Sequence, residues 1–304
     1  MEFDSFLEKN HAFATMYEAI LNADPVIAMS ARTTHTLLQC GMDEPAELIP
    51  RFLEHWAPVD YVDRYLKRVH TIGKIQTVFN LTPNALTLCG DRLRVDRVDY
   101  DIALLLSICV TSHRARLMQK LQNFYASLPS REGALAIIGL GTGYEYVLAR
   151  RHAPQYLAIG YDTDSEALKT ANSFAVFANV SEGHHRHRDF ISPPPAGEER
   201  QGYDAIVACE LLEHVDEPAG VLAHIHSSLN PGGKAFVTMA LNIAQEDHVF
   251  WYISTTQCIE QIHAAGFEIL ESEFIPVRAT PNARVETGAP RGNYAAIITH
   301  SAAT

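Results

Sequence analysis

The strongest constraint on the fold is a short apolar run that leads directly into three closely spaced glycines. Residues 134–138 read Ala-Leu-Ala-Ile-Ile, and Gly139, Gly141 and Gly143 follow before a helical pattern begins. The apolar run predicts a buried strand, and the glycines let a ligand lie against bare backbone. Taken alone, the pattern is equally compatible with an ordinary strand-to-helix turn or with a dinucleotide site, because short motifs give false matches.

From residue 134 onward, short apolar runs alternate with helical stretches, which is typical of a parallel sheet covered by helices. The connection 276–292 is rich in Pro and Gly and has no helical pattern. The last strand should therefore return antiparallel beside the strand before it, which makes the fold α/β with a mostly parallel sheet. We predict helices between the first five strands and between the fifth and sixth, with strands at 134–139, 156–161, 184–188, 204–209, 234–240, 267–274 and 294–299.

The first part of the chain has a different pattern, with apolar residues at helical spacing and prolines that mark frequent turns. A long helix is predicted from Tyr100 to about Ser127, and residues 88–95 are compatible with a short hairpin. The helical period stops near residue 130. We therefore predict two domains, a helical substrate-capping domain at 1–130 and an α/β domain at 131–304.

The charge balance argues against a nucleic-acid ligand. The chain has 24 Lys and Arg against 36 Asp and Glu, a formal net charge of -12, and a surface of that sign repels a polyanion. Basic residues cluster only locally, at 113–116 and 184–188. We expect a small-molecule substrate and no nucleic-acid partner.

The cysteines indicate the compartment. The five cysteines are scattered and odd in number, without a C-x-x-C pair, which is typical of reduced thiols in a cytosol. We find neither a signal-peptide pattern nor the run of about 18 apolar residues that a membrane span needs. A cytoplasmic protein without a membrane partner is expected. The sequence leaves the oligomeric state open, with a homodimer as one alternative.

An acid ends the second predicted strand, about 20 residues after the glycines, as in nucleotide-binding sheets. The run 156–162 closes on Asp162, where a carboxylate can hold both hydroxyls of a ribose. Asp164 is better placed to cap the helix that begins at Ser165. We assign Asp162 and the neighbouring Thr163 to the ligand site.

The third predicted strand is followed by Asp189 and Phe190, where a carboxylate can accept a hydrogen bond from an adenine amino group. The histidines at 184–187 precede this point. We interpret them as a charged edge that faces solvent, because their spacing lacks the ligand pattern of known metal sites. No metal is predicted.

Four motifs in order then resemble the class I S-adenosylmethionine (SAM)-dependent methyltransferases, particularly the small-molecule branch. They are the glycine loop, the acid after the second strand, the run Leu-Glu-His-Val at 212–215 and the turn Leu-Asn-Pro-Gly-Gly at 229–233. The resemblance covers residues 133–300. It implies a Rossmann-like sheet of seven strands, SAM as cofactor and a ligand at the carboxyl ends of the strands.

The resemblance also implies roles for individual residues. One position departs from the family pattern, since Ile137 stands where the family usually has an acid that helps to hold the methionine ammonium. The residues assigned to the cofactor are Gly139, Gly141, Gly143, Asp162, Thr163, Asp189, Phe190 and Glu210.

The acceptor side of the site is less defined. His214 and Glu213 are candidates for a general base because of their location, and the segment that contains His248 resembles the part of the family that lines the acceptor pocket. Glu213 and His214 also suit a structural role in the helix after the fourth strand. The residues assigned to catalysis are His214, Tyr144 and His248, and Tyr144 is further expected in a lid with Tyr61, Tyr65 and Tyr100.

Three functions remain open at this point. The leading hypothesis is methyl transfer from SAM to O, N or C of a small metabolite. The second follows from Ile137, because without a nearby carboxylate the α-amino group of SAM is more easily neutral; it could then attack the γ-carbon and give azetidine-2-carboxylate plus methylthioadenosine. The third is a SAM-binding regulatory subunit without chemistry.

Overall fold

The structure is a computed structural model. It describes residues 11–23, 25, 28–29, 31–32, 104–105, 107–109, 111–192, 202–243, 248–277 and 290–301. The predicted hairpin at 88–95 and the lid tyrosines Tyr61, Tyr65 and Tyr100 lie outside these residues. Of the predicted helical domain at 1–130, the structure describes chiefly α2 (His11–Ala23) and residues 111–130, which contain a second helix.

The central element is a sheet of seven strands in the order β3-β2-β1-β4-β5-β7-β6. Neighbouring strands from β3 to β5 are parallel, and β7 is antiparallel to both β5 and β6. The Rossmann-like sheet and its antiparallel last strand are therefore confirmed. The strands are β1 (Gly133–Ile138), β2 (Tyr156–Asp162), β3 (Arg186–His187), β4 (Tyr203–Ala208), β5 (Leu229–Leu241), β6 (Phe267–Pro276) and β7 (Gly292–His300).

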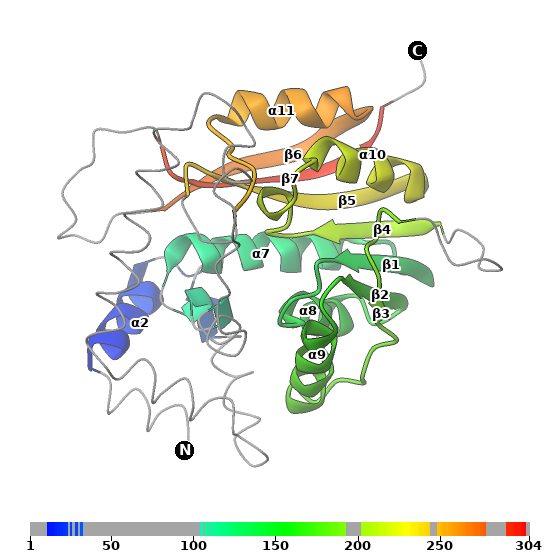
Figure 1. The fold of residues 1–304 in the computed structure, drawn as a ribbon. Coiled ribbons are helices and arrows are strands. Elements are labelled where there is room, and N and C mark those ends of the chain that lie inside the picture. The colour runs from blue at the N-terminus through cyan, green and yellow to red at the C-terminus, as the bar shows by residue number, and fades with distance from the viewer. Residues whose placement is uncertain are drawn as a thin grey trace.

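Helices cover both faces of the sheet, as Figure 1 shows. Alternate residues of a strand point to opposite faces, so Leu135 and Ile137 pack in one core and Ala136 and Ile138 in the other. The first core is closed by α7 (Ser112–Ser127), α8 (Tyr144–His152) and α9 (Ser165–Phe177), and the second by α10 (Pro218–Ser228) and α11 (Thr255–Ala264).

The helix predicted from Tyr100 to Ser127 is interrupted. Residues 104–105 and 107–109 are helical, but Thr111 has extended backbone angles and α7 begins only at Ser112. Leu117, Leu121 and Phe124 of α7 are fully buried in the first core. This helix lies before the predicted domain boundary at residue 130 and still packs on the sheet. The division into domains stays a prediction.

The third strand is shorter than predicted. Residues 184–188 were expected in it, but β3 contains only Arg186 and His187. The backbone N–H of Gly160 in β2 donates to Nδ1 of His185 at 3.2 Å, so an imidazole takes the hydrogen bond that a strand carbonyl would otherwise accept. The predicted helix between β3 and β4 is absent from residues 188–192, while 193–201 lie outside the described part.

Two further expectations concern the state of the cysteines and a membrane-spanning segment. Three of the cysteines, Cys109, Cys209 and Cys258, are buried free thiols. In the part of the chain that the structure describes, no helix combines the length and the apolar character needed to cross a bilayer.

Candidate functional site

The candidate site lies at the carboxyl ends of the parallel strands. From β1 the chain crosses to β2 on one side, and β4 lies on the other side. Ligands of open α/β sheets bind where the strand order reverses in this way. The glycine loop follows β1 at this point, Asp162 ends β2 and Glu210 follows β4. The fold therefore brings together the ends of the strands to which the cofactor residues were assigned.

The glycine loop needs glycine at all three positions, because Gly139, Gly141 and Gly143 have φ values of +70°, +52° and +79°. The surroundings of the three differ. A Cβ on Gly143 would lie 2.6 Å from Cβ of Ala171 in α9, and one on Gly139 would lie 2.9 Å from Cδ1 of Leu211. A Cβ on Gly141 would meet only the Gly139 carbonyl oxygen, at 3.9 Å. Packing thus explains the two outer glycines, whereas Gly141 leaves bare backbone beside open space.

Asp162 is held against this loop. Its Oδ2 accepts a hydrogen bond from the Gly141 N–H at 3.0 Å, and its Oδ1 accepts one from the Asp164 N–H at 2.9 Å. Each carboxylate oxygen has a second lone pair, so the hydroxyls of a ribose can still be bound. Asp164 caps α9 by accepting from Glu166 N–H at 2.9 Å, as predicted. An open glycine cradle beside a fixed carboxylate fits the adenosine part of SAM.

The other residues assigned to the nucleoside lie around β3. Thr163 is exposed, and its carbonyl oxygen lies 3.0 Å from Nε2 of His187. Asp189 is exposed and accepts a hydrogen bond from Ile191 N–H at 3.2 Å. Phe190 is buried, with its ring centroid 5.1 Å from that of Tyr161. Core packing accounts for Phe190, and the contacts of all three with adenosine stay predictions.

Glu210 is the centre of a polar network after β4. It has a left-handed φ of 52°, and its carboxylate accepts hydrogen bonds from Thr238 and Asn293. It also pairs with the buried Arg114 of α7, with 2.7 Å between Nη1 and Oε2. The sequence analysis noted Arg114 only as part of a local basic cluster. Its place on the buried face of an amphipathic helix was the signal that pointed inward.

A second carboxyl group belongs to the same network. Glu145 lies in the first turn of α8, two residues after the glycine loop. Burial raises the pKa of Glu145 to about 7; the positive charge of Arg114 opposes this shift, and the negative charge of Glu210 adds to it. We call Arg114, Glu145 and Glu210 the charged cluster. Ile137, at the position where the family usually has an acid, is 1% exposed and packs in the first core.

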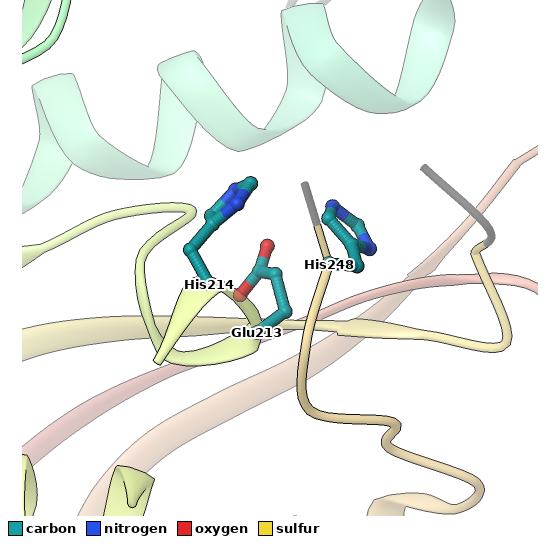
Figure 2. A group of neighbouring side chains, drawn as sticks. All are labelled: Glu213, His214 and His248. Atoms are coloured by element: carbon teal, nitrogen blue, oxygen red, sulfur yellow. The ribbon is translucent and has the colours of Figure 1, made fainter. Parts of the chain in front are cut away.

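Three further side chains meet at the ends of β4 and β5. Glu213 and His214 lie in η2 (Leu212–His214), just after β4, and His248 lies in the segment after β5. Figure 2 shows the Glu213 carboxylate and the two imidazole rings pointing toward one another. The ring centroids of His214 and His248 are 4.8 Å apart. We call these three residues the His214 group.

The backbone holds the His214 group together. The N–H groups of Val249 and Phe250 both donate to the carbonyl oxygen of Glu213, at 2.8 and 2.9 Å. Glu213 is 0% exposed and His248 is 4% exposed, whereas His214 is partly exposed. The expected alternative for Glu213 and His214 was a structural place in the helix after the fourth strand. They form a separate short helix there, before α10 begins.

Tyr144, the third residue assigned to catalysis, lies elsewhere. Its side chain is 1% exposed, and its ring stacks on Phe174 of α9 with 6.2 Å between centroids. Packing between α8 and α9 accounts for this residue. Its catalytic role stays a prediction.

Comparison with known proteins identifies the class and then the family. A seven-stranded sheet with this glycine loop and this acid defines the class I SAM-dependent fold. The family described as "Methyltransferase domain" matches residues 110–272, more than half of the chain. The chain therefore belongs to this methyltransferase family, and it is a SAM-dependent transferase. The match includes α7, which supplies Arg114.

Individual relatives are more distant. The chain is 31% identical over 102 residues to the ubiquinone biosynthesis O-methyltransferase of Aeromonas salmonicida (strain A449), which is 33% of this chain and 40% of that protein. The chain thus matches less than half the length of this curated relative. Among solved structures, it is 16% identical to magnesium protoporphyrin IX methyltransferase from Synechocystis PCC 6803, with a TM-score of 0.48 over 70% of this chain and 87% of the other. For N-methyltransferase NodS from Bradyrhizobium japonicum WM9, the identity is 16% and the TM-score 0.46, over 62% and 87%.

Proposed function

We propose that this methyltransferase acts on a hydroxyl group of a small-molecule metabolite, which is bound at the carboxyl ends of β4 and β5. The observation that carries the proposal is the His214 group, since it gathers two imidazoles and a carboxylate at that edge. A neutral hydroxyl must lose a proton as it is methylated, and histidine is the side chain that most often promotes such a loss near neutral pH. The curated relative is named as an O-methyltransferase, which supports an oxygen acceptor.

The charges of the chain support a small and uncharged or cationic acceptor. The formal net charge is -12. Three of the carboxylates that contribute to it, those of Asp162, Glu210 and Glu213, lie at the same edge of the sheet. A polyanionic acceptor would be repelled there.

The residues divide the work between two ends of the site. When bound, SAM supplies an electrophilic methyl group on a sulfonium that leaves as a neutral thioether. Asp162 and the glycine loop would hold the ribose. The charged cluster would hold the methionine end, because Arg114 offers donors to its carboxylate and Glu210 offers an acceptor to its ammonium. Because Ile137 stands where the family usually has an acid, this assignment gives the role of that acid to groups from α7 and from the end of β4.

The His214 group would then act on the acceptor. The hydroxyl oxygen forms the new bond to the methyl carbon, and the electron pair of the broken S–C bond stays on sulfur. The hydroxyl proton leaves through the His214 group to solvent. In-line placement of the oxygen supplies most of the rate increase, because orientation of reacting groups lowers the barrier by several kcal/mol, about 7 to 11 in favourable cases.

The test uses SAM that carries a deuterated methyl group. The pure protein is incubated with it and with a fractionated metabolite extract, and mass spectrometry follows the label and the nucleoside product. The proposal predicts S-adenosylhomocysteine and one metabolite that gains a labelled methyl group on oxygen. Label on nitrogen or carbon, or on a macromolecule, would refute the oxygen acceptor.

The same assay examines the second hypothesis, cyclisation of SAM. That hypothesis depends on the buried Ile137, an apolar residue at the position where the family usually has an acid. A chain that cyclises SAM would produce methylthioadenosine when no acceptor is present. Methylthioadenosine above the rate in protein-free buffer, without S-adenosylhomocysteine, would favour cyclisation over methyl transfer.

A further inference from the structure

We propose that Glu213, His214 and His248 form a binding site for one divalent transition-metal ion, with Zn²⁺ as the ion that the ligands fit best. One ligand atom from each residue lies within 4.8 Å of the other two. The sequence analysis predicted no metal and considered only the histidines at 184–187. The proposed site lies at a different place, in η2 and in the segment after β5.

The spacing of the three atoms suits one ion. Zinc lies about 2.0 to 2.2 Å from nitrogen and oxygen ligands, so two ligands of one tetrahedral ion are about 3.4 Å apart. The side chains would therefore have to close by about 1 to 1.5 Å to place all three atoms around one ion. His214 is the partly exposed member of the group, and an exposed side chain changes rotamer more readily than a buried one.

The ligand types select the ion. Two imidazoles and one carboxylate form the set found in open zinc sites, where a fourth position is left for water or substrate. The same set also binds other first-row divalent ions. Magnesium and calcium prefer oxygen ligands, and this group offers one carboxylate only. We therefore expect Zn²⁺, Co²⁺ or Mn²⁺ to bind well and Mg²⁺ to bind poorly.

The surroundings prepare two of the ligands. Nδ1 of His248 lies 2.9 Å from the carbonyl oxygen of Ile243. A carbonyl can only accept, so Nδ1 carries the proton and Nε2 carries the lone pair that a metal needs. Histidine ligands are usually oriented by a hydrogen bond of this kind. The two backbone hydrogen bonds to the Glu213 carbonyl fix the other segment.

The exposure of the three residues differs. Glu213 is 0% exposed and His248 is 4% exposed, so a bound ion would be held mainly by buried groups. The partly exposed side at His214 would leave one coordination position open.

The consequence for catalysis rests on the proposed function. An ion at this place would bind the oxygen of the acceptor hydroxyl and lower its pKa, since bound divalent metals acidify oxygen ligands strongly. With their lone pairs on the ion, the three residues would hold the ion in place, and the hydroxyl proton would pass to water once the bound oxygen is acidified. The acceptor class would be metabolites whose hydroxyl can ligate a metal.

The experiment measures metal binding without SAM or acceptor, so that its result does not depend on the reaction. The full chain is stripped with a chelator and dialysed, and Co²⁺ is titrated while the visible absorption of the ion is followed. Zn²⁺ is then added to displace it. We expect one Co²⁺ per chain with the spectrum of a four- or five-coordinate site, and displacement by Zn²⁺ but not by equal Mg²⁺.

Variants locate the ion. Glu213→Gln, His214→Gln and His248→Gln should each weaken Co²⁺ binding by at least about 100-fold, since even an orienting partner of a ligand contributes 10- to 100-fold. The matched control is His184→Gln with His187→Gln, in the exposed histidine cluster, which should bind as the unaltered chain does. Circular dichroism checks that each variant is folded. His214→Gln should disturb folding least, because His214 is the partly exposed residue of the three.

Three outcomes would overturn the metal site. They are no Co²⁺ or Zn²⁺ binding by the unaltered chain, binding that persists in folded His214→Gln, and binding that is lost in the control variant. If the ion binds but chelation leaves methyl transfer unchanged, the site stands and its catalytic consequence is wrong. If the ion binds and no methyl transfer is found, only the proposed function fails.

Discussion

The two ends of the candidate site are built by different means. At the ends of β1 and β2, the groups that suit a ligand are backbone and one carboxylate, within a stretch from Gly139 to Asp162. At the ends of β4 and β5, they are side chains that come from separate segments. The comparison teaches that the groups proposed for the ribose come from one short stretch of sequence, whereas the groups proposed for the methionine end and the acceptor are side chains that the tertiary structure assembles.

Substitution at the acceptor end should have the largest effect on the reaction. His214→Gln is expected to lower kcat by about 10² to 10⁴-fold, the usual range for a lost acid-base group. The Kd for S-adenosylhomocysteine should change less than about threefold, because the cofactor end is untouched. Steady-state kinetics and calorimetry measure the two quantities. His263→Gln, at an exposed position in α11, is the control. A fall in the affinity for S-adenosylhomocysteine as large as the fall in kcat would contradict the separation of the acceptor end from the cofactor end.

At the cofactor end, two glycine substitutions should separate packing from ligand contact. Gly143→Ala places a Cβ 2.6 Å from Ala171 at a positive φ and should lower the free energy of unfolding by about 3 kcal/mol. Gly141→Ala has the same backbone strain but open space, and should cost about 1 to 2 kcal/mol. Chemical denaturation measures both. Gly141→Ala should nevertheless weaken S-adenosylhomocysteine binding, and unchanged affinity would show that no ligand lies against Gly141.

Within the cofactor end, Arg114 should matter only for the methionine part. Arg114→Gln is expected to weaken S-adenosylhomocysteine by about 10-fold or more, the value of one charge-assisted contact. Methylthioadenosine, which lacks the amino-acid group, should bind the variant and the unaltered chain alike. Calorimetry with both ligands gives the comparison. A parallel loss for both ligands would mean that Arg114 acts on the fold through Glu210.

The last expected effect is a pH dependence of stability from Glu145. Burial raises its pKa from 4.5 to about 7, so the folded protein binds this proton more tightly than the unfolded chain. The resulting stability is fully present below the unfolded pKa and is lost as the pH rises through the folded pKa. Between about pH 4.5 and 8, Glu145→Gln should therefore remove about 1 to 3 kcal/mol of the decline in unfolding free energy. Denaturant melts across this range measure it. Parallel profiles for the two proteins would contradict the raised pKa.

The sequence predicted the parts of the molecule that depend on neighbours along the chain. The glycine loop, the end of β2 at Asp162 and the cap by Asp164 follow from local spacing, because a strand that runs into glycines and a helix has few conformations. The seven strands followed from the alternation of apolar runs, and the antiparallel last strand followed from the connection 276–292, which has no helical pattern. The shortening of β3 did not, because it depends on the hydrogen bond between His185 and Gly160.

The acceptor end could be predicted only residue by residue. His214 and His248 were each candidates, but their meeting with Glu213 depends on the pairing of β4 with β5 and on backbone hydrogen bonds to the Glu213 carbonyl. No periodicity in the sequence encodes such a contact. For Arg114, helical spacing indicates a place on the buried face of α7, but its partner Glu210 could not be predicted because it belongs to a distant strand end.

The most direct test is a crystal structure of the chain with S-adenosylhomocysteine. The account predicts the ribose hydroxyls on the carboxylate of Asp162, the nucleoside against Gly141 and the sulfur turned toward the His214 group. A ligand bound away from the glycine loop, or with its sulfur turned from His214, Glu213 and His248, would contradict it.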